Sequence, residues 1–328
     1  MTTAIQVTDL TKTFNSLTAV NHISFGIEQG EIFGLLGPNG AGKTTTLSML
    51  ATMLKPTSGT ATIQGRDIQT DADGVRKEIG IVFQDQSLDE ELTARENMDF
   101  HGRLYRIPAE IRKKRTDELF TLVELQERKN DIVKTFSGGM RRRLEIARGL
   151  LHHPSVLFLD EPTLGLDPQT RNHLWQYIGT LSKEKNITII LTTHYMEEAD
   201  RLCDRIAIID HGKIIALDTP QNLKTGIGGD IITIKTPDPK TVSQVLTMPW
   251  IMRIEQDAEE VHISLQNAEQ HISDIITTLN LHNIPILCVS IHKPTLEDVF
   301  LSFTGKKIRD EEMDRKEMMR MHKKMGRH

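Results

Sequence analysis

The sequence is poor in cysteine and has no excess of basic charge. Its only cysteines, Cys203 and Cys288, stand in no metal-ligand spacing, so we expect two isolated, buried thiols in a reducing cytosol. The net charge of −5 gives no support to a protein that coats nucleic acid, because such domains usually carry a basic excess.

Long apolar runs are also missing. No stretch approaches the roughly 18 apolar residues that cross a bilayer, and the N-terminus "MTTAIQVTDLTKTF" lacks the apolar segment of a secretory signal. With 38% hydrophobic and 26% charged residues, the composition is that of an ordinary globular protein. We therefore expect a cytosolic chain that can lie on the cytoplasmic face of a membrane only as a peripheral protein.

The first two thirds of the chain, residues 1–222, have an α/β pattern. Short alternating strands lead to the apolar run "EIFGLLG", and a helix pattern follows from Gly42 to Met53. The continuous apolar runs 156–160 ("VLFLD") and 187–193 ("ITIILTT") predict strands that are buried on both faces, as parallel sheets require.

A mostly helical stretch, residues 86–150, separates the early strands from the late ones. "TARE", from Thr93 to Glu96, has the spacing of a capping box, and Pro108 stands where a second helix begins. The pattern predicts a helical insertion within the α/β domain.

From residue 223 the pattern changes. Strand-like and helix-like segments alternate in the order βαββαβ, which predicts a small α+β, ferredoxin-like domain over 223–305. The domain ends in "KPTLEDVFLSF", a helix with Leu296, Val299, Phe300 and Phe303 on one face. Residues 306–328 form a charged, Met-rich tail.

"GPNGAGKTT", Gly37 to Thr45, matches the pattern G-x-x-x-x-G-K-[ST] in full. It follows an apolar strand and opens a helix, which favours a phosphate-binding loop over a chance glycine turn. Backbone amides and the helix N-terminus attract phosphates. Lys43 is expected to bridge the β- and γ-phosphates, and Thr44 is expected to offer its hydroxyl to Mg²⁺.

Two carboxylates follow the buried run "VLFLD". Asp160 ends the strand on the side of the phosphate loop, so it can reach the shell of Mg²⁺. Glu161 is then available to polarise a water for attack on the γ-phosphate. The alternative is that "DEP" only ends a strand at a solvated turn.

Three single residues are candidates as well. His194 either touches the γ-phosphate or is an ordinary polar residue at a strand end. Gln84 either faces Mg²⁺ and the attacking water or ends its strand, and Phe14 either stacks on adenine or belongs to the core. The guanine-reading pattern N-K-x-D is absent, which favours ATP over GTP.

A second glycine pair, in "TFSGGMRRR", also opens a helix. Ser137 suits the N-cap, and Gly138 and Gly139 allow close approach of the backbone to an anion. Since the first loop already holds the phosphates of its own nucleotide, this helix start can cover the γ-phosphate that another subunit holds. The alternative is a plain capped helix. Residues 141–143, all arginine, are expected in a solvated first turn without a catalytic role.

Together these residues resemble the ATP-binding cassette family over about residues 1–222. "GPNGAGKTT" is similar to its Walker A loop, and Gln84 stands at the place of its Q-loop glutamine. "FSGGM" is similar to the LSGGQ signature, "VLFLDEP" to Walker B, "GLD" at 165–167 to the D-loop, and His194 to the switch histidine. Phe136 and Met140 depart from the signature, which puts contacts from position 140 in doubt.

The resemblance implies a P-loop NTPase cassette with a RecA-like core and a helical subdomain, hydrolysing ATP with Mg²⁺ in a head-to-tail dimer. It also implies the roles of the residues. Those implied for catalysis are Glu161, His194, Gln84 and Lys43; those for ATP are Phe14, Gly37, Pro38, Asn39, Gly40, Ala41, Gly42, Lys43, Thr44, Thr45, Ser137, Gly138 and Gly139; those for Mg²⁺ are Thr44, Gln84 and Asp160.

Within the family, "QSLDEELTARENMDFHGRLY" and "PTLEDVFLSFTGK" look most like ATPase subunits of daunorubicin-resistance-type exporters. This predicts a subunit that powers export of drugs or other amphipathic small molecules through a separate multi-span permease.

A soluble ATPase acting on nucleic acid or the ribosome is the alternative. The segment between Gln84 and Ser137 is too short for the coiled coil of the DNA-repair members, and the chain has one phosphate loop instead of two. A non-hydrolysing regulatory module is disfavoured by the intact Lys43, Asp160 and Glu161.

Overall fold

A computed structural model describes residues 2–85, 87–257 and 259–304 of the chain. The expected tail, 306–328, lies outside the described residues. The chain divides into two compact units, Met1–Ile214 and Ile215–His328. Within the described residues, no helix combines the length and the apolar character needed to cross a membrane.

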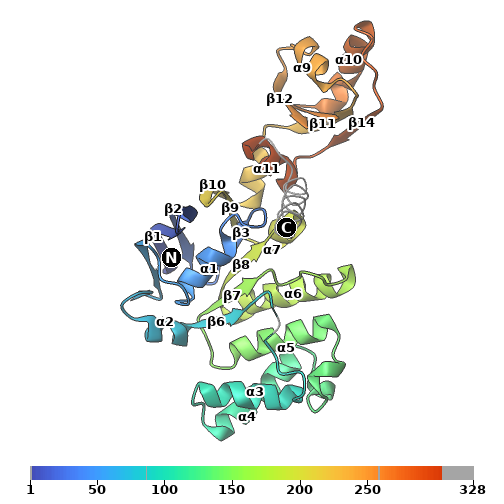
Figure 1. Ribbon diagram of the computed structural model, residues 1–328. Coiled ribbons are helices and arrows are strands. Elements are labelled where there is room, and N and C mark those ends of the chain that lie inside the picture. Colours follow the sequence, from blue (N-terminus) through green and yellow to red (C-terminus); the bar gives the residue numbers. More distant parts are fainter. Residues whose placement is uncertain (1, 86, 258, 305–328) are drawn as a thin grey trace, which may run out of the picture. The chain divides into compact units, whose positions relative to one another are not determined.

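The first unit is built on a six-stranded sheet in the order β10-β9-β3-β8-β7-β6 (Figure 1). The pairs from β9 through β6 are parallel. β3, β7 and β8 are buried along their whole length, which confirms the strands expected from the two apolar runs. The strands are β3 (Ile32–Leu36), β6 (Ile79–Val82), β7 (Val156–Asp160), β8 (Thr188–Thr193), β9 (Arg205–Asp210) and β10 (Lys213–Asp218).

Three helices follow strands of this sheet: α1 (Lys43–Leu50) after β3, α6 (Pro168–Lys185) after β7, and α7 (Met196–Leu202) after β8. α1 is shorter than the predicted helix from Gly42 to Met53, because Gly42 adopts a left-handed N-cap conformation and Ala51 caps the other end.

A second, antiparallel sheet in the same unit has the order β2-β1-β4-β5. The expectation of short strands at the N-terminus is wrong, because β1 (Thr3–Phe14) and β2 (Leu17–Glu28) are 12 residues each. Several register shifts, one of them between Val7 and Leu10, interrupt the alternation that the sequence pattern relies on. β4 (Ser58–Ile63), β5 (Arg66–Asp67) and α2 (Ala72–Glu78) complete this part.

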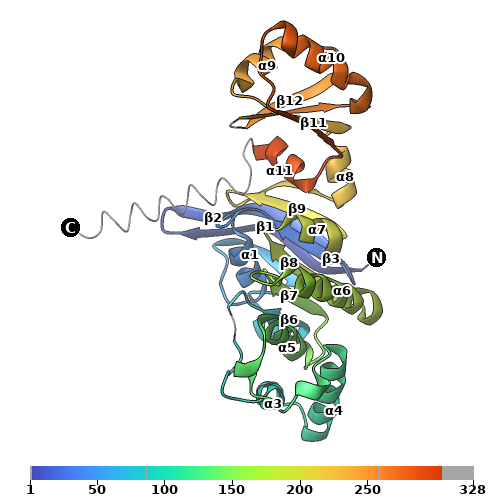
Figure 2. The same ribbon diagram turned by 90° about the vertical axis from the view of Figure 1, so that its right-hand side faces the viewer.

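The expected helical insertion is present between β6 and β7, and both ribbon views show its helices gathered beyond the β6 edge of the sheet (Figures 1 and 2). The predicted capping box of Thr93 and Glu96 is confirmed. Apolar side chains such as Met98, Phe120 and Leu144 form the insertion's own core. Its elements are α3 (Ala94–Leu104), α4 (Ala109–Leu122), the 3₁₀ turns Gln126–Arg128 and Val133–Thr135, and α5 (Gly138–Leu150).

The second unit contains the expected βαββαβ order, in an antiparallel sheet β12-β13-β11-β14. α9 and α10 lie on one face of this sheet, and α11 on the other (Figure 2). Its elements are α8 (Pro220–Thr225), β11 (Asp230–Lys235), α9 (Pro239–Val245), β12 (Ile251–Asp257), β13 (Glu260–Leu265), α10 (Ala268–Leu281), β14 (Cys288–His292) and α11 (Leu296–Thr304).

The expectation of two buried thiols needs correction. Cys203 is buried, but Cys288 is exposed because it begins an edge strand of the second unit's sheet. In α11, Leu296, Val299 and Phe300 are buried, whereas Phe303 is 55% exposed in the last turn.

Candidate functional site

The loop between β3 and α1 is shaped by glycines that the fold requires. A Cβ on Gly37 would lie 2.2 Å from the carbonyl oxygen of Ile209, and Gly42 has a φ of +108°. The buried ammonium of Lys43 donates to the carbonyls of Gly37 (2.7 Å) and Pro38 (3.1 Å), which fixes it over the loop that carries the backbone amides. This geometry suits a phosphate chain held by main-chain donors and one lysine.

Thr44 and Asp160 come together from different parts of the chain. The Thr44 hydroxyl donates to Asp160 Oδ1 over 3.2 Å, and Thr192 at the end of β8 donates to the same oxygen. Asp160 is 2% exposed, at the carboxyl end of β7. A hydroxyl and a carboxylate in contact are the hard oxygen ligands that Mg²⁺ prefers, so this pair fits the metal.

Glu161 lies beside both Lys43 and His194. Its Oε1 is 3.8 Å from Lys43 Nζ and 3.2 Å from His194 Nδ1. Burial raises the pKa of Glu161, but the hydrogen bond to His194 and the charges of His194 and Lys43 outweigh it, so the pKa lies below its usual value. The structure thus brings three of the four residues proposed for catalysis to one point and keeps the carboxylate ionised at neutral pH.

Among the described residues, the side chains of Gln84 and Phe14 make no hydrogen bond with this cluster. Gln84 follows β6 by two residues, and its exposed side chain makes no hydrogen bond to Thr44 or Asp160 among the described residues. Phe14, at the end of β1, is 44% exposed, with Lys12 Nζ 5.1 Å from its ring centroid. An aromatic face this exposed is not core, so stacking on a base remains a prediction.

The second glycine pair opens α5 as expected. Ser137 is its N-cap and accepts a hydrogen bond from the amide of Met140 over 3.3 Å. A Cβ on Gly139 would lie 2.2 Å from Thr170 Cγ2, so this position requires glycine. Phe136 is buried in the insertion core and Met140 packs against it. The two residues that depart from the signature therefore contribute to the packing of the insertion core, whereas Ser137 and Gly138 are exposed.

The solvated turn expected for residues 141–143 is wrong for Arg142. Its side chain is buried, and its guanidinium donates to backbone carbonyls at the ends of β6 and β7. Arg141 and Arg143 instead form ion pairs with Glu90 and Glu124 of the insertion. Glu145, three residues after Arg142 and so on the same face of the helix, is the signal in the sequence that points to a partner for this arginine.

Two family models match the chain. The ABC transporter model covers residues 20–164, and the model of the C-terminal domain of DrrA1-3-like ATP-binding proteins covers residues 219–304.

Similar proteins align over nearly the whole chain. The linearmycin resistance ATP-binding protein LnrL of Bacillus subtilis is 38% identical over 93% of this chain and 100% of its own length. The Nod factor export ATP-binding protein I of Ralstonia nicotianae is 40% identical over 94% and 96%. The daunorubicin/doxorubicin resistance ATP-binding protein DrrA of Streptomyces peucetius is 37% identical over 93% of each chain.

Solved structures of ATP-binding subunits share the fold over about two thirds to three quarters of this chain. CbiO1 of Clostridium perfringens, part of an ABC transporter complex, superposes with a TM-score of 0.64 and 27% identity, covering 76% of this chain and 97% of its own. The cassette MJ0796, solved as a dimer in a post-hydrolysis state with ADP and Pi, gives a TM-score of 0.59 and 29% identity over 66% and 98%.

Proposed function

Because this chain belongs to the ABC transporter family, as the ATP-hydrolysing subunit of an exporter, we propose that Glu161 is its general base. The observation that supports this role is the meeting of Lys43, Glu161 and His194 beside the contact of Thr44 with Asp160. Nothing in the matches favours the nucleic-acid or ribosome alternative.

Each residue then has one task. Lys43 and the amides of the loop bind the β- and γ-phosphates of ATP, as in other phosphate loops. Glu161 accepts a proton from the attacking water, and His194 holds that carboxylate in place through its hydrogen bond. Gln84 orients the water from the neighbouring loop, and Phe14 stacks on adenine.

We also propose that Thr44 and Asp160, assisted by Gln84, hold Mg²⁺. When bound, the ion neutralises charge that develops on the phosphate oxygens. The hydroxyl of Thr44 and the carboxylate of Asp160 are already in contact, and the bond from Thr192 orients the carboxylate.

Replacing Lys43 with alanine is expected to weaken ATP binding, since the substitution removes the charged phosphate contact. Nucleotide affinity, measured by titration with a fluorescent ATP analogue, should fall by at least about tenfold, the range of a lost charge-assisted hydrogen bond. Lys134→Ala is the control, because Lys134 is exposed and pairs with Glu91 in the insertion. Unchanged affinity in Lys43→Ala would contradict the assignment of the loop.

The active assembly that we propose is a head-to-tail dimer in which the start of α5 in one copy covers the γ-phosphate bound by the other. The exposed Ser137 and Gly138 at a capped helix start support this, as does the dimer formed by MJ0796, a protein similar to this chain. Residues 1–222 are proposed to form the cassette, and 223–305 an accessory domain for assembly or regulation.

We further propose that the cargo is a drug or another amphipathic small molecule. Relatives are named for linearmycin, daunorubicin or doxorubicin resistance and for Nod factor export. The chain is then a peripheral subunit at the cytoplasmic face of the membrane, working on a separate multi-span permease.

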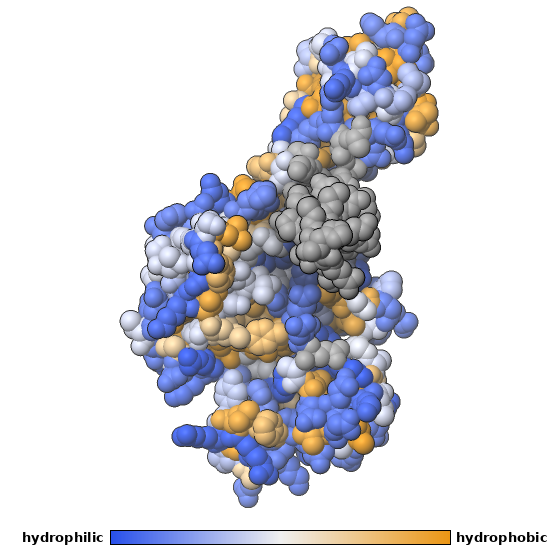
Figure 3. Space-filling model, in the orientation of Figure 1, coloured by the Kyte–Doolittle hydropathy of each residue, from blue (hydrophilic) through white to orange (hydrophobic). Residues whose placement is uncertain are grey.

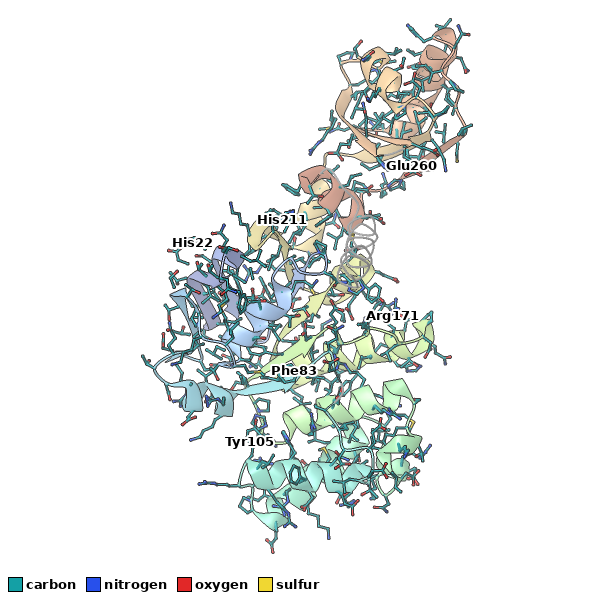
Figure 4. All side chains as sticks on the ribbon, viewed as in Figure 1. His22, Phe83, Tyr105, Arg171, His211 and Glu260 are labelled. Carbon is teal, nitrogen blue, oxygen red and sulfur yellow. The ribbon has the colours of Figure 1, made fainter. Side chains whose placement is uncertain are left out.

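The surface proposed to dock on the permease lies on α3. Phe100 and Leu104 are 60% and 64% exposed, one helical turn apart, and Tyr105 follows them. Apolar side chains gather over this end of the insertion (Figure 3), and Tyr105 lies there with its ring stacked on that of His152 (Figure 4). Leu88, in the loop that precedes α3, packs against the insertion core instead.

A cysteine at Phe100 is expected to crosslink to a cytoplasmic loop of a multi-span membrane protein in native membranes. A charged residue there, Phe100→Glu, should abolish transport and leave basal ATP hydrolysis within about twofold, because the side chain is remote from the phosphate loop in sequence and fold. Leu281→Cys, 76% exposed on α10, serves as the control for nonspecific crosslinking. Full transport by Phe100→Glu without any membrane crosslink would contradict the docking proposal.

A further inference from the structure

Arg142, in the second turn of α5, joins two loops through one buried guanidinium. Its Nε donates to the carbonyl of Pro162 over 3.0 Å, and Nη2 donates to the carbonyl of Asp160 over 2.7 Å. Its Nη1 donates to the carbonyl of Phe83 and to Glu145 Oε2. The side chain is 7% exposed, so these bonds are not shared with bulk solvent.

The positions of these carbonyls in the sequence connect Arg142 to the reaction. Asp160 and Pro162 stand on either side of Glu161, so the guanidinium holds the peptide group that precedes the general base and the carbonyl of the residue that follows it. Phe83 immediately precedes Gln84, and Figure 4 places it at the carboxyl end of β6. The loop that carries Glu161 and the loop that carries Gln84 are therefore both hydrogen-bonded to Arg142.

Glu161 needs such support because of its backbone. Its φ is +45°, in the left-handed region that non-glycine residues rarely adopt, and such a conformation persists only where its surroundings fix it. The amide of Glu161 is held by the carbonyl of Thr192 (3.1 Å) and by the hydroxyl of the same residue (3.0 Å). Arg142 donates to the carbonyl of Asp160, which belongs to the same peptide group as this amide.

The connection continues along α5. Glu145 is 1% exposed, pairs with Arg142 over 3.1 Å, and accepts a hydrogen bond from the amide of Ser87 over 2.9 Å. One turn further, Arg148 donates to the carbonyl of Ser87 over 2.6 Å and to its hydroxyl. The loop with Gln84 is thus held on both sides, by Arg142 at Phe83 and by Glu145 and Arg148 at Ser87.

We propose that Arg142, together with Glu145, is a positioning residue that couples the helix begun by Ser137 to Glu161 and Gln84 of the same chain. The inference rests on the proposed roles of these two residues in hydrolysis. When α5 moves as its N-terminus engages the ATP of a second copy, the guanidinium carries that movement to the loops at its own ATP. Closure at one site is thereby linked to the catalytic geometry of the other.

The guanidinium is the part that lysine cannot replace. It presents five donors in a fixed plane, whereas the lysine ammonium is a point charge with three. Arg142→Lys keeps the charge beside Glu145 and loses the simultaneous bonds to Asp160, Pro162 and Phe83. Arg143→Lys is the matched control: Arg143 is on the same helix and bonds to Val123 and Glu124 of the insertion, and within the described residues it makes no hydrogen bond to either loop.

In Arg142→Lys we expect kcat for ATP hydrolysis to fall about 10²-fold, the loss that a 1 Å misplacement of a catalytic group causes. KM for ATP is expected to stay within about threefold, since Lys43 and the phosphate loop are unchanged. Arg143→Lys should keep both constants. A rise in KM with kcat unchanged, or equal losses in the two variants, would overturn the proposal.

Hydrogen–deuterium exchange of the full-length chain separates positioning from a general loss of stability. Peptides that cover residues 80–90 and 157–165 are expected to exchange faster in Arg142→Lys, while peptides from β3 and α1 keep the wild-type rate. Faster exchange throughout the first unit would assign Arg142 a purely structural role and overturn the proposal. If Arg142→Lys does not fold, Glu145→Gln decides the question, because it keeps an acceptor for Ser87 and removes the charge that orients Arg142.

The exchange result also distinguishes this inference from the proposed function. If Glu161→Gln hydrolyses ATP normally, the assignment of the general base fails, yet local loosening in Arg142→Lys would still show that Arg142 holds the two loops. If Glu161→Gln is inactive and neither peptide loosens in Arg142→Lys, the inference about Arg142 fails alone.

Discussion

Replacing Glu161 with glutamine is expected to slow ATP turnover by at least about 10²-fold, the low end of the contribution of a general base. Glutamine keeps the shape of the side chain and a carbonyl oxygen that accepts from His194, but it cannot take a proton from water. ATP binding should be retained, because Lys43 and the amides of the loop are unchanged. Steady-state phosphate release and equilibrium nucleotide binding measure the two quantities separately.

The environment of Glu161 strengthens this expectation. Burial raises its pKa, but His194 and Lys43 lower it by more, so the side chain enters the reaction as a carboxylate throughout the neutral range. Glu197→Gln is the control, since Glu197 is exposed in the first turn of α7, three residues after His194. Turnover of Glu161→Gln within a factor of two of the wild type would exclude the role of Glu161 as a base.

Much of this site is encoded in short, local patterns. The phosphate loop stands between an apolar strand and a helix, and the two continuous apolar runs became β7 and β8, buried at every position. Parallel strands place their carboxyl ends along one edge, so Asp160, Glu161 and His194 meet near Lys43 once the strand order is known. Sequence patterns of this kind depend on few long-range contacts.

What the sequence did not predict depends on contacts between distant segments. Arg142 looks like a surface residue beside Arg141 and Arg143, and only the approach of Phe83, Asp160 and Pro162 gives its donors a buried set of acceptors. The N-terminal strands are longer than expected. Register shifts between β1 and β2 break the alternation of inward and outward side chains, so the sequence pattern shows only short strands. Tertiary pairing decides both features, and a local pattern cannot report it.

The second large effect is expected at Ser137. With ATP present and hydrolysis blocked by Glu161→Gln, the chain should shift from monomer toward dimer in sizing measurements, because the closed assembly cannot break down its nucleotide. Adding Ser137→Arg should abolish this shift. Ser137 is exposed at the start of α5, where a long side chain would occupy the place that the partner's γ-phosphate needs.

Ser137→Arg also removes a helix cap, which costs about 1 kcal/mol. A second substitution must therefore distinguish the loss of the phosphate contact from the loss of helix stability. Ser137→Asp provides it: aspartate is as good an N-cap as serine, yet its negative charge would face the phosphate. Ser273→Arg, at an exposed serine of α10, controls for added bulk and charge. If Ser137→Asp and Ser137→Arg both remain monomeric while Ser273→Arg dimerises, the block arises from the phosphate contact and not from a frayed helix. If all three dimerise with ATP to the same extent, Ser137 does not lie at the interface, and the glycine pair after it has only the local task of opening α5.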